Sequence, residues 1–199
     1  MATTCESIIT QGLDKNCQDP LVRGFERKGW IFNRRDIDFS AVEFGSLPNV
    51  LSTLPLKEGA KGYSIYQYGN TPYTGSSVVL SPGTYGASAT NNLNIVVMDA
   101  SPEVHANFID PAMDGDFVVV LEAKYKNLKA ASNAGASAFR VFGFYQGLTL
   151  AESTSEFYSD DTMGGFPLSL TEANVPKSAL FLYASSYEAT KQMLDETLV

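Results

Sequence analysis

The chain has 199 residues, of which 44% are apolar and 12% aromatic, so it is long enough to bury a core and too apolar for a disordered protein. Its 22 Asp and Glu outnumber its 14 Lys and Arg, which gives a net charge of −8, and no run rich in Lys or Arg occurs. This balance argues against a protein that grips nucleic acid through phosphate contacts.

The first forty residues are polar and mixed, and we expect them to form the N-terminal arm of a single β-rich domain that spans residues 1–199. They lack the basic and apolar regions of a signal peptide, and no window of the chain approaches the roughly 18 apolar residues of a membrane span. Cys5 and Cys17 lack CxxC spacing and nearby histidines. We therefore interpret them as reduced thiols, with a pairing or a shared metal site as the alternative.

Strand signals begin with Trp30, Ile31 and Phe32. From residue 45 to 92 the chain is rich in Gly, Ser, Pro, Thr and Tyr, which favours tight turns and short strands over helices. Within this stretch "YSIYQY" (63–68) and "SSVVLS" (76–81) are predicted strands. We expect the surrounding region, about 57–92, to form a long loop region.

The central part of the chain combines strands with one short helix. "LNIVVMDA" (93–100) is a predicted strand, and a helix follows in which Ser101 caps the first turn and Pro111 and Gly115 stop the last. "FVVVLEAKY" (117–125) is the strongest strand signal, and we expect "SAFRVFGFYQGLTL" (137–150) to pair back onto it as a hairpin.

The C-terminal part adds two strands and a helix. "FPLSLTE" and "SALFLYA" are predicted strands on either side of a turn at Pro176. An amphipathic helix follows, with Ser185 or Ser186 as its cap and Tyr187, Thr190 and Met193 on its apolar stripe, together with Leu194 and Leu198. The sequence therefore predicts a mainly β protein, an antiparallel β-sandwich or barrel with one or two short flanking helices.

No residue pattern indicates catalysis. The one histidine, His105, lies in the predicted short helix without a nucleophile motif such as GxSxG, so we interpret it as a surface or packing residue. Two acidic clusters lack the spacing of a calcium loop and are interpreted as solvated turns, with a calcium-ordered loop as the alternative. They contain Asp114, Asp116, Asp160 and Asp161. We predict a protein that is not an enzyme and uses no cofactor or metal.

Several predicted strands are apolar on both faces. Strand alternation places Phe139, Val141 and Tyr145 on one face of residues 137–150, and Phe142 and Phe144 on the other. A second apolar face needs a cover, either the helices and the long loop or another subunit. We take these strands as a candidate assembly interface. Its residues are Phe117, Val118, Val120, Phe139, Val141, Phe142, Phe144, Tyr145, Phe181 and Tyr183.

The order of these segments resembles the tail tube proteins of long-tailed bacteriophages. The resemblance covers residues 93–199, from "LNIVVMDASPE" through "FVVVLEAKY", "SAFRVFGFYQGLTL" and "FPLSLTE" to "SALFLYASSYEATKQMLDETL". In that family a strand, a short helix and a long strand precede a paired strand that ends in a "G-L" step, and a polar excursion and two terminal strands follow. The N-terminal "GFERKGWIFNRRDIDF" also resembles phage structural proteins, less specifically.

The resemblance implies a virion structural protein that is assembled in the host cytoplasm into hexameric rings, whose inner strands join into a continuous tube. Rings would stack through a long loop, here residues 57–92, and through the N-terminal arm. Its partners would be copies of itself and other virion proteins, without a membrane. DNA would pass through an acidic lumen during ejection as cargo, without specific binding.

Two other classes of protein stay open. One is another virion component, such as a connector ring, a tail terminator or a capsid decoration protein. The other is a carbohydrate-binding β-sandwich module, which would stack sugars on Tyr63, Tyr66, Tyr68 and Tyr73. That second class requires exposed, coplanar tyrosine rings on one sheet face.

Overall fold

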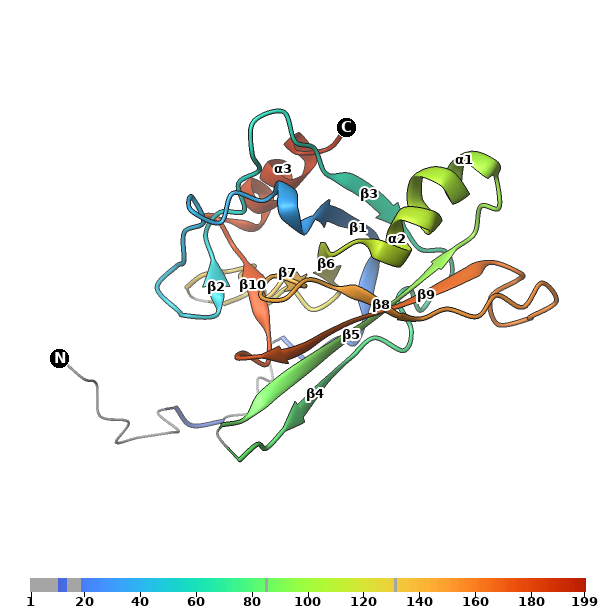
Figure 1. Cartoon of the computed structure of the whole chain (residues 1–199). Helices are drawn as coiled ribbons and strands as arrows, with labels where there is room; N and C mark the ends of the chain where they lie inside the picture. The colour runs from blue at the N-terminus through green and yellow to red at the C-terminus, as the bar shows by residue number, and fades with distance from the viewer. Residues whose placement is uncertain (1–10, 14–18, 85, 131) are drawn as a thin grey trace.

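Two β-sheets packed face to face, with two helical segments packed against them, make up the molecule (Figure 1). The computed structural model describes residues 11–13, 19–84, 86–130 and 132–199, so Cys5 and Cys17 lie outside the described residues. Neighbouring strands are antiparallel with a single exception among the described pairs, and the helices are few and short. The predicted fold class, a mainly β protein of the sandwich type, is confirmed.

The larger sheet has six strands, and its inner strands include one from the N-terminal part of the chain. Their order across the sheet is β2 (Val50–Leu51), β10 (Leu180–Leu182), β7 (Phe139–Phe142), β6 (Phe117–Ala123), β1 (Phe25–Asn33) and β3 (Tyr63–Tyr66). The β2–β10 pair is parallel. Residues 25–33 were expected to belong to an arm, but they form an inner strand. Trp30 and Phe32 are buried on one face of this strand, and Ile31 is buried on the other.

The smaller sheet has four antiparallel strands. They are β4 (Ser77–Ser81), β5 (Ser88–Val97), β9 (Phe166–Val175) and β8 (Thr149–Glu152), in that order across the sheet. Strands β3 and β4 and the beginning of β5 fall within residues 57–92. The strands predicted at 63–68 and 76–81 are therefore confirmed, and only part of the expected loop region is loop.

The first helical segment runs from α1 (Pro102–Val104) through a π turn, η2 (His105–Ile109), into α2 (Asp110–Asp114). The Ser101 hydroxyl accepts a hydrogen bond from the backbone N–H of Val104, which confirms the predicted cap. The prediction that Pro111 stops the helix is wrong. In the π turn the backbone hydrogen bonds span five residues instead of four, as from the N–H of Asp110 to the carbonyl of His105. The helix therefore continues through Pro111, which has no N–H to donate, and ends at Asp114.

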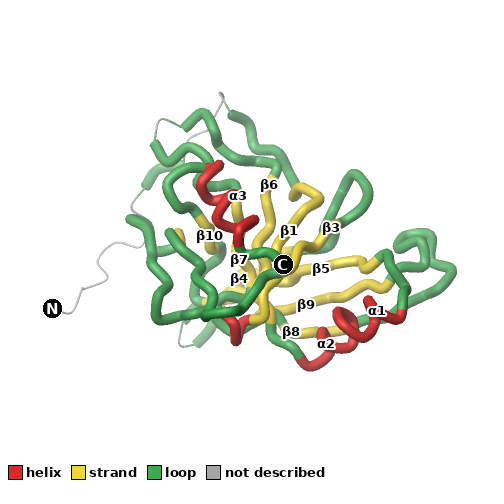
Figure 2. The backbone as a smooth tube through the Cα atoms, turned by 90° about the horizontal axis from the view of Figure 1, so that it is seen from above, coloured by secondary structure: helices red, strands yellow, loops and turns green. Residues whose placement is uncertain are grey.

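The second helix, α3 (Tyr187–Glu196), lies over the six-stranded sheet (Figure 2). The Ser186 hydroxyl accepts the N–H of Ala189, and Thr190 and Leu194 are buried, which confirms the predicted cap and stripe. A short 3₁₀ helix, η1 (Arg34–Asp36), follows β1.

Both faces of the six-stranded sheet are covered within one chain. On one face Trp30, Val118 and Phe139 form a core with Leu194 of α3 and with Leu54 of the segment that follows β2. The other face forms a second core against the four-stranded sheet and α2. That core includes Ile31, Val119, Leu121, Phe142, Leu93, Ile95, Ala112, Leu168 and Leu170. Strands with two apolar faces are therefore explained by the packing of a single molecule.

The segment "SAFRVFGFYQGLTL" is not one strand. Strand β7 ends at Phe142, the chain turns at Gly143 with φ +82°, and β8 begins at Thr149 in the other sheet. Because this turn breaks the alternation, Phe144 lies in the same core as Phe139 rather than beside Phe142. The predicted hairpin between residues 117–125 and this segment is confirmed by the antiparallel β6–β7 pair.

Candidate functional site

Among the described residues, no helix and no further sheet packs on the outer face of the four-stranded sheet. Along β5 and β9, alternate side chains such as Leu93 and Leu168 point into the core, so the others point outward. The helices lie on the opposite side of this sheet (Figure 1). The outward residues of the two long strands are Ser88, Thr90, Asn92, Asn94, Val96, Pro167, Ser169, Thr171 and Ala173.

This outer face is polar and almost uncharged. The amide of Asn92 donates to Ser77 Oγ at 3.3 Å, and the hydroxyl of Thr171 donates to Asn92 Oδ1 at 3.0 Å. The four strands, all within the described residues, contain no Lys, Arg or His. Their two acids are Glu152, paired with outward Ser169, and the buried Glu172. Such a face offers hydrogen bonds to water and no cation to a phosphate group.

Both outer strands of this sheet are exposed. No charged residue and no proline lies in β4, and its Leu80 is 66% exposed. An edge strand of this kind lacks the charges or prolines that protect the edges of monomeric sheets. At the other end, Thr149, Ala151 and Glu152 of β8 are exposed, and α2 contacts that strand. Within the part of the chain that the structure describes, no strand pairs with the outer side of β4 or of β8, so the sheet has two different free edges.

A buried carboxylate holds the turn that carries the chain from one sheet to the other. Glu172 on β9 is 1% exposed. Its Oε1 accepts the backbone N–H groups of Tyr145 (2.8 Å) and Gln146 (2.9 Å). Its Oε2 accepts the N–H of Gly143 (2.8 Å) and the amide of Asn91 (2.9 Å). Four donors therefore converge on one carboxylate, which positions β8 and the free edge that it forms.

The side chain of Arg34 holds the same turn from the opposite direction. Its Nη2 donates to the carbonyl of Tyr145 at 2.8 Å and its Nε to that of Phe144 at 3.3 Å. Burial and the nearby charge of Glu172 raise the pKa of the Tyr145 hydroxyl. The turn is thus fastened through its N–H groups by Glu172 and through its carbonyls by Arg34.

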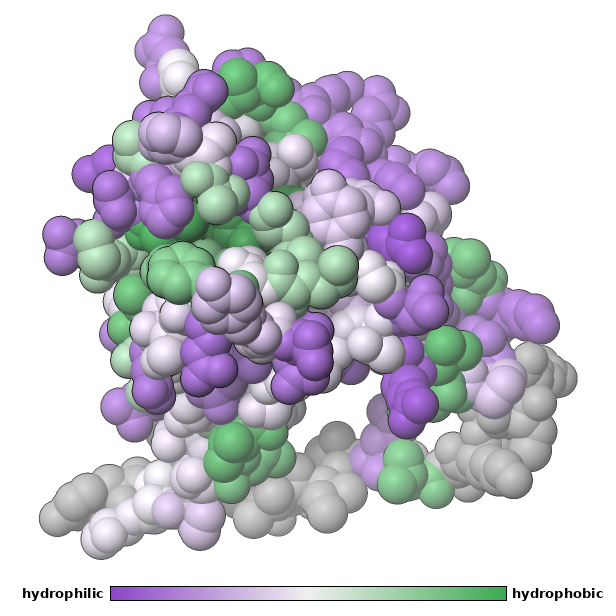
Figure 3. All heavy atoms as spheres, turned by 90° about the vertical axis from the view of Figure 1, so that its right-hand side faces the viewer, coloured by the Kyte–Doolittle hydropathy of each residue, from purple (hydrophilic) through white to green (hydrophobic). Residues whose placement is uncertain are grey.

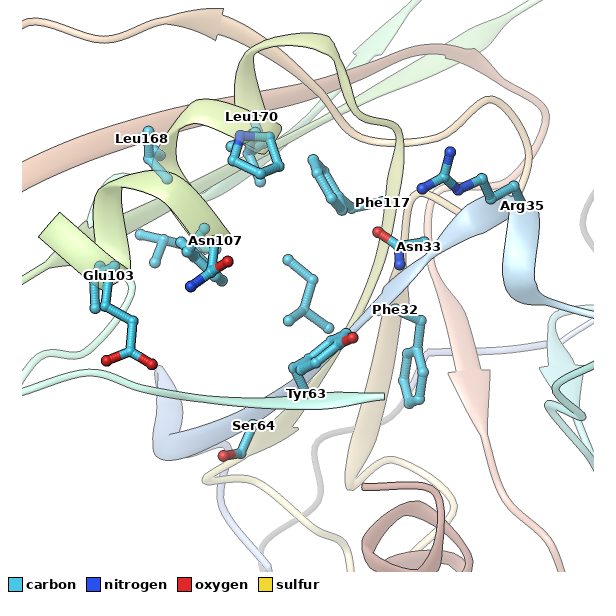
Figure 4. Close-up of a pocket in the computed structure, with 16 residues that line it drawn as sticks. Phe32, Asn33, Arg35, Tyr63, Ser64, Glu103, Asn107, Phe117, Leu168 and Leu170 are labelled. Atoms are coloured by element: carbon cyan, nitrogen blue, oxygen red, sulfur yellow. The ribbon is translucent and has the colours of Figure 1, made fainter. Parts of the chain in front are cut away.

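An apolar cavity of about 510 Å³ opens between the two sheets and the α1–α2 segment (Figure 4). In Figure 4, Leu168, Leu170 and Phe117 lie along one side of the cavity, and Glu103 and Tyr63 lie along the facing side. Among the lining residues Glu103 is the one carboxylate, and none is a histidine, cysteine or lysine. The cavity is suited to accept an apolar group, and its lining contains no pair of side chains arranged for nucleophilic or acid–base chemistry.

A second polar cluster lies where β6 meets α3. Glu122, which is 4% exposed, accepts hydrogen bonds from Lys126 Nζ (2.5 Å) and from the Tyr187 hydroxyl (2.6 Å), and Lys191 Nζ lies 3.6 Å away. Burial raises the pKa of Glu122, but the bonds and charges of Lys126, Tyr187 and Lys191 together outweigh it and hold the pKa below its ordinary value of 4.5. The same contacts raise the pKa of Lys126 against the effect of burial.

We expect Glu122 to make stability depend on pH in the acidic range. A carboxyl whose pKa is lowered by folding stabilises the fold above its unfolded pKa, and that contribution is lost as the pH falls through the folded value. Glu122→Gln should therefore lower the free energy of unfolding at pH 7 by about 1–3 kcal/mol, with a difference from the wild type that shrinks between about pH 5 and pH 3. Urea unfolding at several pH values measures this, with exposed Glu188→Gln as the control. A constant difference across the range would contradict it.

The structure buries most residues of the candidate assembly interface within one chain. Seven of its ten side chains are buried within one chain and leave no surface for a second copy: Phe117, Val118, Val120, Phe139, Val141, Phe142 and Phe144. Three are half-buried: Tyr145, Phe181 and Tyr183. The sequence left two covers open, the helices and the long loop or another subunit, and the structure shows an intramolecular cover made by the second sheet, α3 and the segment that follows β2.

The four tyrosines proposed as a sugar platform do not form one. Tyr73 is buried, and its hydroxyl donates to the carbonyl of Arg27 at 3.1 Å. Tyr66 and Tyr68 are exposed, but their rings meet edge to face at 78°. Flat stacking of a sugar on several rings requires coplanar faces, so this arrangement does not favour a carbohydrate-binding module.

The other singled-out residues lie apart from one another. His105 packs edge to face on Phe166, with ring centres 5.9 Å apart, which confirms its interpretation as a packing residue. Asp160 and Asp161 are exposed in turns between β8 and β9, and Asp114 ends α2. No group of three or more His, Cys, Asp or Glu in the described part of the chain is arranged to hold a metal ion.

Comparison with known proteins returns no relative. No family model matches the chain, and neither a curated protein nor a solved structure is significantly similar to it. Within residues 11–13, 19–84, 86–130 and 132–199, none of the helices has the length and apolar character required to cross a membrane.

Proposed function

We propose that this protein is a phage virion structural protein that assembles into rings, which stack into the tube through which DNA passes. The observation that carries the proposal is the four-stranded sheet, which combines two free edges with an uncovered outer face that lacks cations. If β4 of one copy pairs with β8 of the next, the contact joins two different surfaces, and repeated contacts of this kind close into a ring when the rotation permits. The outer faces then line the ring.

The dimensions of such a ring suit DNA. Six copies, the number that the tail tube resemblance implies, contribute four strands each to one closed sheet. With strands about 4.8 Å apart, this sheet has a circumference of about 115 Å and a backbone diameter of about 37 Å, which strand tilt widens further. Because the inward side chains would be mostly Ser, Thr and Asn, they fill little of this opening.

The chemistry of the outer face supports passage rather than binding. Proteins hold DNA mainly through Lys and Arg on its phosphates, and these four strands contain neither. Instead of the acidic lumen that the resemblance implies, the proposed lining is close to neutral, with Glu152 as its one acid. A hydrated Ser, Thr and Asn surface lets a polyanion slide without a strong attraction or a strong barrier.

Negative-stain electron microscopy and light scattering of the purified full chain test the proposal. We expect rings or tubes for the wild type, and monomers for Leu80→Lys, because a lysine on the exposed β4 edge opposes strand pairing. Leu128→Lys, also at an exposed leucine but in a loop, should assemble like the wild type. Circular dichroism should report the same fold for all three proteins.

Different outcomes separate the alternatives. Rings that never stack would favour another ring component of the virion, such as a connector or a tail terminator. A wild type that remains monomeric at high protein concentration would contradict assembly, and so would a Leu80→Lys variant that forms normal rings.

A further inference from the structure

Positive charge is concentrated in one pocket of this acidic protein. A cavity of about 500 Å³ is lined by the ends of β1 and β6, the turn at residues 69–72 and α3. Five of the chain's 14 Lys and Arg line it, against two acids, Glu26 and Glu122. The five are Arg27, Lys28, Lys124, Lys126 and Lys191. The pocket is thus a cationic site on a molecule whose net charge is −8.

Two of these cations have donors to spare. Lys28 pairs with Asp195 at 2.6 Å, and Lys126 pairs with Glu122. Among the described residues, neither Arg27 nor Lys124 lies within 4 Å of a carboxylate. Arg27 donates to the Gly69 carbonyl and the Tyr66 hydroxyl, and Lys124 donates to the Asn70 carbonyl. A guanidinium has five N–H donors and an ammonium three, so both retain donors for an anionic group.

The loop between β8 and β9 has the complementary chemistry. It projects beyond the sheets, in orange at the right of Figure 1. From Val141 to Pro176 the chain contains no Lys, Arg or His, and the acids Glu156, Asp160 and Asp161 are exposed in this loop. In Figure 3, which views the molecule from this side, apolar side chains gather near the middle of the face among hydrophilic ones.

Large apolar side chains at the tip of this loop are almost fully in solvent. Phe157 is 82% exposed, Tyr158 100% and Met163 81%. The tip is nevertheless shaped by its own turns, in which Gly164 N–H bonds to the Ser159 carbonyl and Gly165 N–H to that of Thr162. A shaped tip that combines exposed aromatic rings with acids has the composition of a docking element.

We propose that the β8–β9 loop of one copy docks into the basic pocket of the next copy, with Asp160 and Asp161 facing Arg27 and Lys124. The pocket and the loop lie on different elements and share no residue, so the contact joins copies head to tail. This inference rests on the proposed assembly and names a contact in it. It is separate from the β4–β8 edge pairing.

Two full-chain charge-reversal variants test the contact. The pocket variant carries Arg27→Glu and Lys124→Glu, and the loop variant carries Asp160→Lys and Asp161→Lys. In each variant alone, loop and pocket have the same sign and should repel. In a mixture, the pocket of each variant can meet the loop of the other variant, which has the opposite sign of charge. Their net charges become −12 and −4 from the wild-type −8, so both remain negative and overall attraction does not explain binding.

We expect self-association, measured by analytical ultracentrifugation, to be at least about 10-fold weaker for each variant alone and to return when the two are mixed. Raising the salt should weaken the mixed complex. A control with the same charge change, Lys61→Glu with Lys177→Glu outside the pocket, should associate like the wild type. Neutral variants, Arg27→Gln with Lys124→Gln, provide a second measurement if a charge reversal disturbs folding. They should weaken association in the same direction.

The outcomes separate this contact from the proposed function. Rings that form normally in both charge-reversal variants, or a mixture that associates no better than its components, would overturn the loop–pocket contact and leave the ring proposal standing. Association could instead return in the mixture while Leu80→Lys behaves like the wild type and micrographs show no rings. This combination would support the loop–pocket contact and overturn the ring proposal.

Discussion

Replacement of Glu172 by alanine is expected to lower the free energy of unfolding by about 4 kcal/mol, which corresponds to a fall in Tm of about 10 °C for a domain of this size. The side chain is buried, and three backbone N–H groups and the Asn91 amide donate to its two oxygens. Without the carboxylate, these donors lose their acceptor in a place where water has little access, and each unpaired group costs free energy. Urea and thermal unfolding of the variant measure the loss.

Two further variants make the prediction specific. Glu172→Gln keeps the size of the side chain but presents an NH₂ group to donors, so at least one pair of contacts becomes repulsive and we expect about 2–3 kcal/mol of destabilisation. Glu152→Ala removes an exposed carboxylate from the same sheet and should stay within about 0.5 kcal/mol of the wild type. A Glu172→Ala protein as stable as Glu152→Ala would show that the carboxylate does not hold the turn.

The second large effect is expected at Gly143, where β7 ends and the chain turns toward the other sheet. Its φ is +82°, and a Cβ there would lie 2.1 Å from the carbonyl oxygen of Phe117, which accepts the N–H of Leu148. Gly143→Ala therefore adds a backbone clash to the ordinary cost of a left-handed alanine. We expect a loss of about 3 kcal/mol or more in the free energy of unfolding, measured by urea denaturation.

Gly59→Ala is the matched control for this prediction. Gly59 has a similar φ of +78°, but nothing lies within 4 Å of the position of its Cβ. It should cost about 1 kcal/mol, the conformational term alone. Equal losses at the two positions would mean that the close approach at Gly143 relaxes easily and does not constrain the turn.

Local signals predicted the secondary structure well where a short stretch decides it. The hydroxyls of Ser101 and Ser186 cap helices as expected, because the cap depends on residues within one turn. The three valines after Phe117 lie in a strand that is buried on both faces. A continuous apolar run in the sequence is typical of such a strand. Pro111 was misjudged because the π turn before it is not visible in the pattern.

The candidate site was only partly visible in the sequence. The alternation in "SATNNLN" places small polar residues on one face of β5, which is a signal for an outward polar face. The partner of Glu172 was not predictable, because its donors at Gly143, Tyr145 and Gln146 lie 26 to 29 residues away along the chain. The two glycines of "GFYQG" were the one local sign that a turn interrupts the strand.

The sequence by itself determined the fold class, the positions of most strands and helices, and a surface poor in cations, because periodicity, capping and charge are local or additive properties. The tertiary structure alone decided what covers each strand. Burial of both faces of β6 and β7 depends on a second sheet and a helix that are distant in the chain. For the same reason, only folding gathers Arg27, Lys124 and Lys191 into one pocket and leaves β4 and β8 as free edges.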